Sequence, residues 1–273
     1  MTDRYAVIGN PIGQSKSPLI HAGFAKQLQQ DMTYVALLAP VDGFAAAVDA
    51  FRADGGRGMN VTVPFKTNAH AYATDLMERA RLAGAVNCLK FEGDRVYAEN
   101  YDGVGMVNDI QANLGFALRG RRVLLLGAGG AARGVALPVL AAHAAELVIV
   151  NRTVARAEAL KEMFSPYGAV SSCGYPDLAG RAFDIVLNAT TTSLHGELPP
   201  ITASVFARGC LAYDMVYGKG LTPFLRLARE AGAARIADGA GMLVEQAAEA
   251  FQWWRGVRPD TRAMLAAIAV PLS

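Results

Sequence analysis

The stretch Leu124–Arg156 decides the fold, and it reads LLLGAGGAARGVALPVLAAHAAELVIVNRTVAR. An apolar run ends at 126, the glycine-rich turn GAGGAA occupies 127–132, and a helix-like segment leads to a second apolar run that ends at 150. A strand, a glycine turn at a helix start and a second strand are typical of a dinucleotide-binding unit. We expect the pyrophosphate at the helix start, because free N–H groups and the helix dipole favour negative charge there.

The residues that follow the second run indicate which dinucleotide binds. An NAD site carries Asp or Glu about 20 residues after the glycines, where the acid bonds the ribose 2′-hydroxyl. This chain has Asn151, Arg152 and Thr153 there, with Arg156 one turn further on. Guanidinium groups bind a 2′-phosphate that a carboxylate would repel, so the sequence predicts NADP rather than NAD. The alternative is a glycine turn in an unrelated α/β sheet with solvated arginines behind it.

Composition excludes several classes of protein. The chain has 273 residues, of which 52% are hydrophobic, enough for one or two domains. The net charge is only +2 and no Lys/Arg cluster is interleaved with aromatics, so nucleic-acid binding is not expected. The three cysteines are far apart and the four histidines lack metal-ligand spacing, which favours a reducing compartment and no metal. Neither a signal-peptide pattern nor a membrane-spanning run is apparent, so we expect a cytoplasmic protein.

The chain on both sides of the nucleotide unit alternates between predicted strands and helices, which indicates a largely parallel sheet. Before it, we expect strands at 4–9, 33–38 and 58–63, helices at 19–29, 42–53, 66–76 and 77–82, and a hairpin from 85–90 and 95–98. After it, we expect strands at 183–187, 211–216 and 236–237, and helices at 222–231, 239–254 and 260–268. A helix at 102–113 connects the two regions, and glycines at 103–105 and 239–241 predict hinges for domain closure.

Two serines precede the first predicted helix, in the sequence GNPIGQSKSPLIH at 9–21. Ligands of open α/β sheets bind where strands end. Ser15 and Ser17 at a helix start can bind a carboxylate or hydroxyls through side chains and backbone N–H groups. It is at least as plausible from the local sequence that Ser15 is only a turn residue and Ser17 only the helix N-cap, with Pro18 in the first turn.

Further polar residues follow the next strands. Asn60 and Thr62 are two residues apart on a strand and so face the same side. Lys66 stands at the strand-to-helix turn, where a cation is disfavoured by the helix dipole and where it can serve as a proton donor or as a plain solvated residue. Asn87 ends an apolar run, an unusual place for an amide. Asp102 is placed to cap the next helix and can still turn an oxygen toward Lys66.

These clusters, together and in this order, resemble the shikimate dehydrogenase family. The matching strings are GNPIGQSKSPLIH, GMNVTVPFK, GAVNCL, ENYDGVG, LLLGAGGAARG, VNRTVAR, NATTTSL, YDMVYG and DGAGMLVEQ. The resemblance implies reversible NADPH-dependent reduction of 3-dehydroshikimate to shikimate, in the shikimate pathway to the aromatic amino acids. It also implies an α/β substrate domain with a mostly parallel sheet, residues 1–102 plus 240–273, and a Rossmann-type NADP domain, residues 103–239. The oligomeric state is open, a homodimer included.

The resemblance also assigns roles. Lys66 and Asp102 match the catalytic pair, which also contacts substrate. The other substrate positions are Ser15 and Ser17 for the carboxylate, Tyr217 near it, and Asn60, Thr62, Asn87 and Gln246 for the ring hydroxyls. The cofactor positions are Gly127, Ala128, Gly129, Gly130, Ala131, Asn151, Arg152, Thr153, Arg156, Met215 and Gly239, with a weaker match at Glu78. The chain departs from the usual pattern at Gln14, Cys88 and Tyr101, and Tyr101 adjoins Asp102.

Two alternatives compete with this interpretation. A shikimate/quinate dehydrogenase of the same fold would accept a broader range of substrates or use NAD, and such relatives often carry an acid at the position of Asn151. A non-catalytic NADP-binding regulator would have lost Lys66, Asp102 or the serine pair, and all of these are present.

Overall fold

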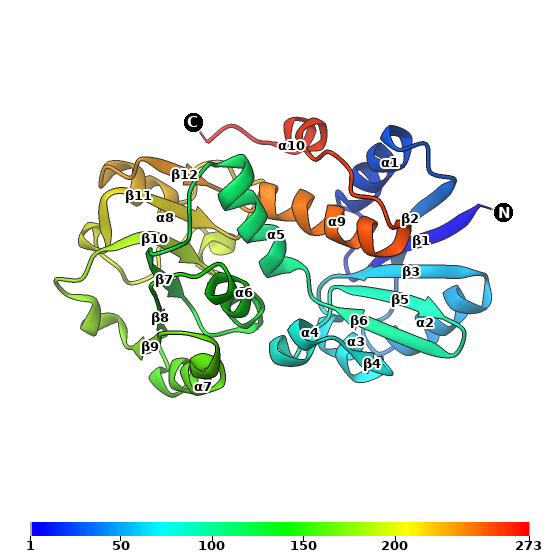
Figure 1. Ribbon diagram of the computed structural model, residues 1–273, viewed down its shortest axis with the longest axis horizontal. Coiled ribbons are helices and arrows are strands. Elements are labelled where there is room, and N and C mark those ends of the chain that lie inside the picture. Colours follow the sequence, from blue (N-terminus) through cyan, green and yellow to red (C-terminus); the bar gives the residue numbers. More distant parts are fainter. Residues whose placement is uncertain (1, 273) are drawn as a thin grey trace. The chain divides into compact units, whose positions relative to one another are not determined.

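The computed structural model describes residues 2–272 (Figure 1). Its internal contacts divide the chain into two compact units. Unit 1 comprises the chain up to Asp102 together with Val244–Ile268, and unit 2 comprises Gly103–Leu243 and the residues from Ala269 onward. The predicted substrate domain also included 240–243 and 269–272, which this division places in unit 2, while residues 1 and 273 lie outside the described part. Within 2–272, no helix has the length and apolar character needed to cross a bilayer.

Unit 1 is built on a six-stranded sheet of order β2-β1-β3-β5-β6-β4. Its elements are β1 Asp3–Gly9, α1 Ser17–Gln27, β2 Met32–Leu38, α2 Phe44–Ala53, β3 Gly56–Val61, α3 Lys66–Tyr72, β4 Asp75–Leu76, α4 Glu78–Ala83, β5 Cys88–Glu92, β6 Arg95–Glu99, α9 Ala240–Arg255 (which begins in unit 2) and α10 Arg262–Ile268. β1 pairs in parallel with β2 and β3, and β4 pairs in parallel with β6. The predicted hairpin is confirmed: β5 and β6 are antiparallel, and β5 is also antiparallel to β3.

The two faces of this sheet are covered by different helices, because side chains alternate between its faces along each strand. Ala6, Ile8 and Met59 pack on one face with residues of α2 and α3, whereas Tyr5 packs on the other with Trp254 of α9. In Figure 1, α9 lies above this sheet and α2 and α3 lie below it. The indole N–H of Trp254 donates to the backbone oxygen of Leu89 at 3.0 Å, which ties α9 to β5.

Three element predictions in unit 1 were wrong. The strand predicted to reach residue 63 ends at Val61. The helix predicted over 66–76 ends at Tyr72, and Asp75–Leu76 instead pairs with β6, because the tertiary ladder outweighs helix propensity in so short a segment. Ser17 is not the N-cap of α1: it is the first helical residue, its backbone N–H donates to Ser15 Oγ at 3.3 Å, and Lys16 occupies the cap position.

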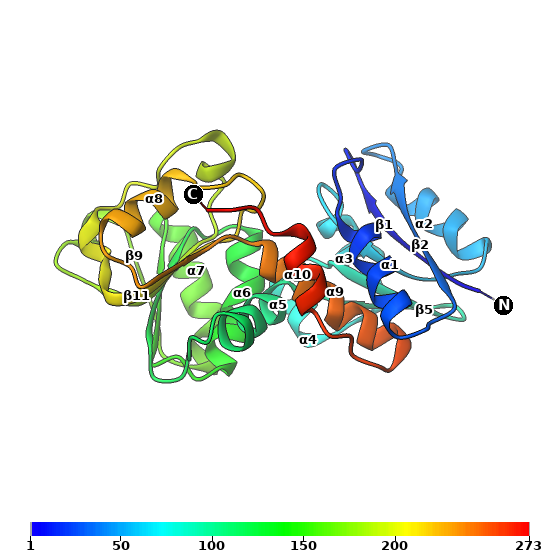
Figure 2. The same cartoon turned by 90° about the horizontal axis from the view of Figure 1, so that it is seen from above.

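Unit 2 contains a six-stranded sheet of order β12-β11-β10-β7-β8-β9, with every pairing parallel. Its elements are α5 Asp102–Asn108 (whose first residue belongs to unit 1), η1 Asp109–Asn113, β7 Arg122–Leu126, α6 Gly130–Ala141, β8 Glu146–Val150, α7 Val154–Phe164, η2 Ser165–Tyr167, β9 Val170–Cys173, η3 Tyr175–Leu178, β10 Phe183–Asn188, η4 Thr192–His195, η5 Ala203–Val205, β11 Phe206–Asp214, α8 Pro223–Glu230 and β12 Arg235–Ala237. Figure 2 shows α8 and α6 on opposite sides of this sheet. The Rossmann-type prediction is confirmed.

The helix predicted over 102–113 changes character midway. It is α-helical to Asn108 and π-helical over Asp109–Asn113. The Asp109 carboxylate is buried and accepts from Tyr213 Oη at 2.8 Å, and the Tyr213 hydroxyl in turn accepts from the backbone N–H of Met242 at 3.1 Å. A Cβ at Gly241 would lie 2.0 Å from that carboxylate. Gly241 therefore has a packing reason within unit 2, and the hinge expected at 239–241 stays a prediction.

Candidate active site

The polar clusters of unit 1 converge because of its strand order. β1 lies between β2 and β3, so the chain passes from β1 to a strand on one side and then to a strand on its other side. Ligands bind at such a switch point, beyond the carboxyl ends of the strands. The segments that follow β1 and β3 are joined by backbone bonds, from Asn10 N–H to the Val63 oxygen and from Thr62 N–H to the Ile8 oxygen, both at 3.0 Å. The sequence 9–21 and the sequence 60–66 are thereby held side by side.

Lys66 and Asp102 meet in the structure. The Lys66 ammonium donates to Asp102 Oδ2 at 2.6 Å, with 32% of the lysine side chain and 16% of the aspartate side chain exposed. Asn87 Nδ2 donates to the other carboxylate oxygen at 2.8 Å. Both carboxylate oxygens are therefore held, and the ammonium keeps further N–H donors that can face a ligand.

The Asn87 side chain links this pair to two further residues. Its second amide N–H donates to Gln246 Oε1 at 3.3 Å, and its own oxygen accepts from the backbone N–H of Tyr101 at 2.9 Å. The side chain is almost completely buried. Since both amide N–H groups are already directed at protein acceptors, the geometry makes Asn87 mainly an organiser of Asp102 and Gln246.

The serine pair lies at the start of α1. Ser17 is buried and Ser15 is half-buried, and the Ser15 oxygen accepts the backbone N–H of Ser17. Thr62 is half-buried just beyond β3. Asn60 is buried, and its amide bonds three partners inside unit 1, the residues Tyr34, His21 and Asn87. The structure thus collects the hydroxyl donors near the strand ends, while the Asn60 side chain faces the protein interior.

The three departures from the family pattern adjoin these groups in sequence, but their side chains make other contacts. The Tyr101 ring packs edge-on against Trp253 at 6.0 Å, beneath the Arg79 guanidinium, and Cys88 is buried in the same cluster between the sheet and α9. Gln14 is exposed and donates to the backbone oxygen of Pro11 at 3.3 Å. Because the Tyr101 backbone still bonds Asn87, its substitution leaves the neighbouring Asp102 in place.

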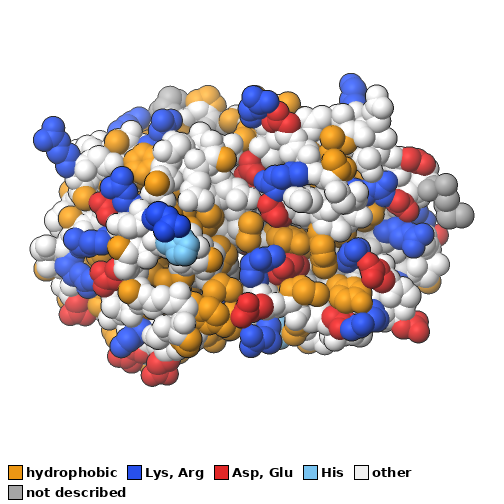
Figure 3. All heavy atoms as spheres, viewed as in Figure 1, with side chains coloured by type: hydrophobic (Ala, Val, Ile, Leu, Met, Phe, Trp, Pro, Cys, Tyr) orange, Lys and Arg blue, Asp and Glu red, His pale blue; other side chains and the backbone are white. Residues whose placement is uncertain are grey.

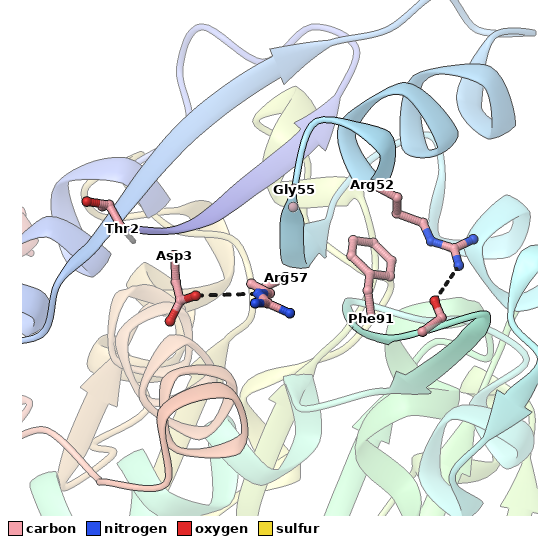
Figure 4. Close-up of a pocket in the computed structure, with 8 residues that line it drawn as sticks. Thr2, Asp3, Arg52, Gly55, Arg57 and Phe91 are labelled. Carbon is pink, nitrogen blue, oxygen red and sulfur yellow. Dashed lines mark hydrogen bonds and ion pairs between the residues drawn. The ribbon is translucent and has the colours of Figure 1, made fainter.

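A groove in unit 1 lies at the other, amino-terminal end of the central strands. Figure 4 shows Arg52, Arg57 and Phe91 around it, with Asp3 bonded to Arg57 and Arg52 donating to a backbone oxygen. Charges of both signs are likewise interspersed over the face drawn in Figure 3. Since the cations of the groove already have protein partners and ligands of such sheets bind at the carboxyl ends, we do not place the active site here.

The glycine turn of unit 2 has the form that a dinucleotide requires. Gly127 has a φ of +102°, a conformation that favours glycine, and a Cβ there would lie 3.2 Å from the Thr190 side chain. A Cβ at Gly129 or Gly130 would meet nothing within 4 Å, so their backbone faces open space. α6 begins at Gly130 without a side-chain cap, which leaves its first N–H groups for a ligand. Ala132 is buried where the helix packs on the sheet.

The residues expected to select NADP lie at the end of β8. Asn151 donates from its amide to the backbone oxygen of Thr153 at 2.9 Å and so shapes the turn into α7. Arg152 and Arg156 are both exposed, and none of the ion pairs found within 2–272 involves either of them. Both guanidinium groups are therefore exposed without an ion-pair partner in the described part of the chain, and the glycine turn and this turn together fit NADP.

The remaining cofactor positions are distributed between the units. Met215 and Gly239 lie together beyond β11 and β12, and a Cβ at Gly239 would lie 2.3 Å from the Met215 backbone oxygen. Tyr217, expected near the substrate carboxylate, belongs to unit 2 and is 41% exposed. Glu78, the weaker cofactor match, belongs to unit 1 and starts α4 beside Arg81.

A buried carboxylate that sequence reasoning missed shapes the loops of unit 2. Asp214 accepts from Ser193 Oγ at 2.6 Å, from Thr222 Oγ1 at 2.7 Å and from the backbone N–H of Val216 at 3.2 Å. Burial raises the pKa of Asp214, against the lowering effect of these bonds. The bonds fix the loop that carries Met215. The signal was present in the strings NATTTSL and YDMVYG, but nothing in either string shows that their side chains meet.

Comparison with known proteins agrees with this geometry. Residues 7–89 match the model described as the shikimate dehydrogenase substrate binding domain, residues 110–196 match shikimate / quinate 5-dehydrogenase, and residues 239–269 match the shikimate 5′-dehydrogenase C-terminal domain. A curated shikimate dehydrogenase (NADP(+)) of Nitrosospira multiformis is 58% identical to this chain, and the match covers 97% of this chain and 96% of the relative.

Solved structures agree as well. An Ael1 enzyme from Pseudomonas putida superposes with a TM-score of 0.97 at 56% identity, over 100% of both chains. Shikimate 5-dehydrogenase from Thermus thermophilus, solved in complex with NADP(H) and shikimate, superposes with a TM-score of 0.88 at 32% identity, over 98% of both chains. With a relative 58% identical along nearly its whole length and all three family models matched, the chain belongs to the shikimate dehydrogenase family.

Proposed function

We propose that the protein catalyses the reversible NADPH-dependent reduction of 3-dehydroshikimate to shikimate, as an enzyme of the shikimate pathway. The observation that carries the proposal is the bonded pair Lys66–Asp102, held at the carboxyl ends of the unit 1 strands, in the unit that also carries the two serines. Unit 2 adds the glycine turn and the two exposed arginines that fit NADP. A fold alone would not specify this activity, because function resides in the site.

The reacting carbonyl needs a donor where negative charge develops. When bound, NADPH supplies the hydride that reduces the carbonyl carbon. Lys66 donates one N–H to the carbonyl oxygen, stabilises the charge that forms there and transfers the proton that completes the new hydroxyl. In the reverse direction the neutral amine accepts the proton of the same hydroxyl.

Asp102 holds the lysine for this transfer. Its Oδ2 accepts from the Lys66 ammonium, and the Asn87 amide fixes its Oδ1, so the carboxylate cannot rotate freely. Ser15 and Ser17 are the proposed donors to the substrate carboxylate, and Thr62 and Gln246 the proposed partners of the ring hydroxyls.

A substrate and cofactor panel tests the proposal. Purified protein is given shikimate or quinate, each with NADP or NAD, and formation of the reduced nicotinamide is followed by absorbance. We expect kcat/KM for shikimate with NADP to exceed every other combination by roughly 10²-fold, the scale of discrimination that a site with dedicated hydrogen bonds readily reaches. No turnover of shikimate with either dinucleotide would refute the proposal.

The second candidate is a dehydrogenase that also oxidises quinate. The family model that matches residues 110–196 is described as shikimate / quinate 5-dehydrogenase, so it includes this activity. Quinate carries an extra hydroxyl on the carbon that bears its carboxylate, so it needs more space beside the serine pair. Ser17 is only 6% exposed, which favours the flatter shikimate. Comparable kcat/KM for the two acids in the same panel would establish this candidate. We further propose a cytoplasmic location, in keeping with three free, buried cysteines.

A further inference from the structure

The last residues of β10 and β11 are joined by their side chains as well as by the sheet. Asn188 and Asp214 are register partners in this parallel pair, and Asn188 Nδ2 donates to Asp214 Oδ1 at 3.4 Å. The backbone N–H of Thr190 can only donate, and it reaches the Asn188 amide oxygen at 3.1 Å, so it fixes the orientation of that amide. Both side chains are completely buried. The two strand ends are therefore held together where the loops beyond them begin.

Asp214 accepts from four donors. Its Oδ2 accepts from Ser193 Oγ at 2.6 Å and from Thr222 Oγ1 at 2.7 Å. Its Oδ1 accepts the backbone N–H of Val216 at 3.2 Å as well as the Asn188 amide. These donors belong to the end of β10, the loop that follows it, and the loop between β11 and α8. A buried polar network whose groups are all bonded rigidifies its surroundings, so one carboxylate holds both loops.

The two loops border the glycine turn. The backbone N–H of Ala189 donates to the last backbone oxygen of β7 at 3.0 Å. A Cβ at Gly127 would lie 3.2 Å from the Thr190 side chain, so the loop after β10 lies against the turn. The backbone N–H of Met215 donates to the last backbone oxygen of β10 at 3.0 Å, which ties the second loop to the first.

The strand order places these loops on the other side of β7 from the arginines. β7 lies between β8, which is followed by Arg152 and Arg156, and β10, whose other neighbour is β11. A dinucleotide lies across the carboxyl ends of such a sheet, with its pyrophosphate at the helix start after the first strand. With the 2′-phosphate at the turn after β8, the ends of β10 and β11 are left for the nicotinamide half.

We propose that Asp214 is a positioning residue for the nicotinamide half of NADP, acting through the loops that carry Thr190 and Met215. The inference rests on the proposed function, in which unit 2 binds NADP. Because Asp214 is completely buried, it acts through these loops rather than by contact with the cofactor. Its contribution is pre-organisation: the loops are ordered before NADP arrives, so binding does not have to order them.

The variant Asp214→Asn tests the inference through binding rather than activity. Whichever way the new amide faces, its NH2 group meets two donors that the carboxylate accepted. We expect the dissociation constant of NADP, measured by calorimetry, to rise roughly tenfold, the scale of a lost bond to a charged group. Adenosine 2′,5′-bisphosphate carries only the 2′-phosphorylated adenosine half, so its dissociation constant should stay within about twofold of wild type.

Two comparisons separate positioning from a general loss of structure. Asp184→Asn is the matched control, because Asp184 lies near the amino-terminal end of the same strand and accepts the Arg122 backbone N–H at 2.8 Å. It should change neither constant. Thr222→Val removes one donor to Asp214 together with the cap that accepts from Leu225, and should weaken NADP binding by about threefold or more without affecting the bisphosphate. Thr222→Ser keeps the hydroxyl and should restore wild-type binding.

The split between the two ligands decides the outcome. An unchanged dissociation constant for NADP in Asp214→Asn would overturn the inference. Equal weakening of NADP and the bisphosphate would also overturn it, because Asp214 would then support unit 2 as a whole. If Asp214→Asn does not fold, the two Thr222 variants decide by the same criterion. Wild-type protein that binds neither ligand would overturn the proposed function together with this inference.

Discussion

Lys66 occupies an awkward position for a cation, the first residue of a helix whose dipole disfavours positive charge there. Asp102, 2.6 Å away, compensates locally. Such an arrangement has little value for stability, since part-exposed ion pairs contribute at most about 1 kcal/mol. It suits the proposed catalytic role, because an ammonium held at a fixed point can meet an oxygen that becomes negative only during the reaction.

His21 carries a residue-scale prediction about pH. Burial lowers the pKa of its imidazole from 6.5 to about 3. Because the folded-state pKa is below the unfolded one, unfolding takes up a proton between these values, and the free energy of unfolding falls as the pH falls through this window by up to about 1.4 kcal/mol per pH unit. His21→Gln removes this titration. Chemical denaturation at several pH values should therefore show that the free energy of unfolding of the wild type falls toward that of the variant as the pH is lowered.

The exposed His195 provides the control for that experiment. His195→Gln should give a curve of unfolding free energy against pH that runs parallel to wild type. If the His21→Gln curve also ran parallel to wild type, the imidazole would not be held neutral by burial.

Among the elements, we propose that the turn after β8 sets cofactor choice. Arg152 and Arg156 stand on this turn and on the first turn of α7, so one element presents both to a 2′-phosphate. Arg152→Ala should raise KM for NADPH roughly tenfold or more, as expected for a lost bond to a charged group, and should change KM for NADH little. The exposed Arg208 gives a matched control, since Arg208→Ala should alter neither constant. Equal losses with both cofactors would refute the 2′-phosphate assignment.

We expect substitution of two glycines of unit 2 to affect stability and cofactor binding in opposite ways. A Cβ at Gly241 would lie 2.0 Å from the buried Asp109 carboxylate, so Gly241→Ala should destabilise the protein by about 1–3 kcal/mol, the usual cost of overpacking. A Cβ at Gly130 meets nothing within 4 Å, so Gly130→Ala should leave the free energy of unfolding nearly unchanged and weaken NADP binding. Denaturation and cofactor titration of both variants check this pair, and comparable stability of the two would contradict it.

Elements and sites differ in how far they can be predicted from sequence. The glycine turn, its flanking strands and the 92–94 hairpin turn depend on local signals and were correct to within a few residues. β9 was missed because VSSC at 170–173 has no apolar alternation, and η1 was missed because nothing in DIQAN at 109–113 distinguishes a π turn from an α turn. The Asp214 network was missed for a different reason: its members belong to two strand ends and two loops, and their sequence does not show that they meet.

At the scale of the whole molecule, each unit brings separate chemistry. Unit 1 holds the proposed acid–base pair and the serines, and unit 2 holds the glycine turn and the arginines. The motif strings were enough to predict the family, because many short patterns in fixed order are jointly specific. The hydrogen-bond directions within unit 1 required coordinates, since they depend on which amide atom faces which partner.

If Lys66 transfers the proton in a shikimate–NADP reaction, its loss must lower the turnover of Lys66→Ala at saturating shikimate and NADP. Because the lysine acts on charge that develops in the transition state, kcat should fall by roughly 10²-fold or more, while calorimetry shows shikimate binding within a few-fold of wild type. A near-normal kcat in this variant would leave Lys66 as an ordinary helix-start residue and would show that another group supplies the proton.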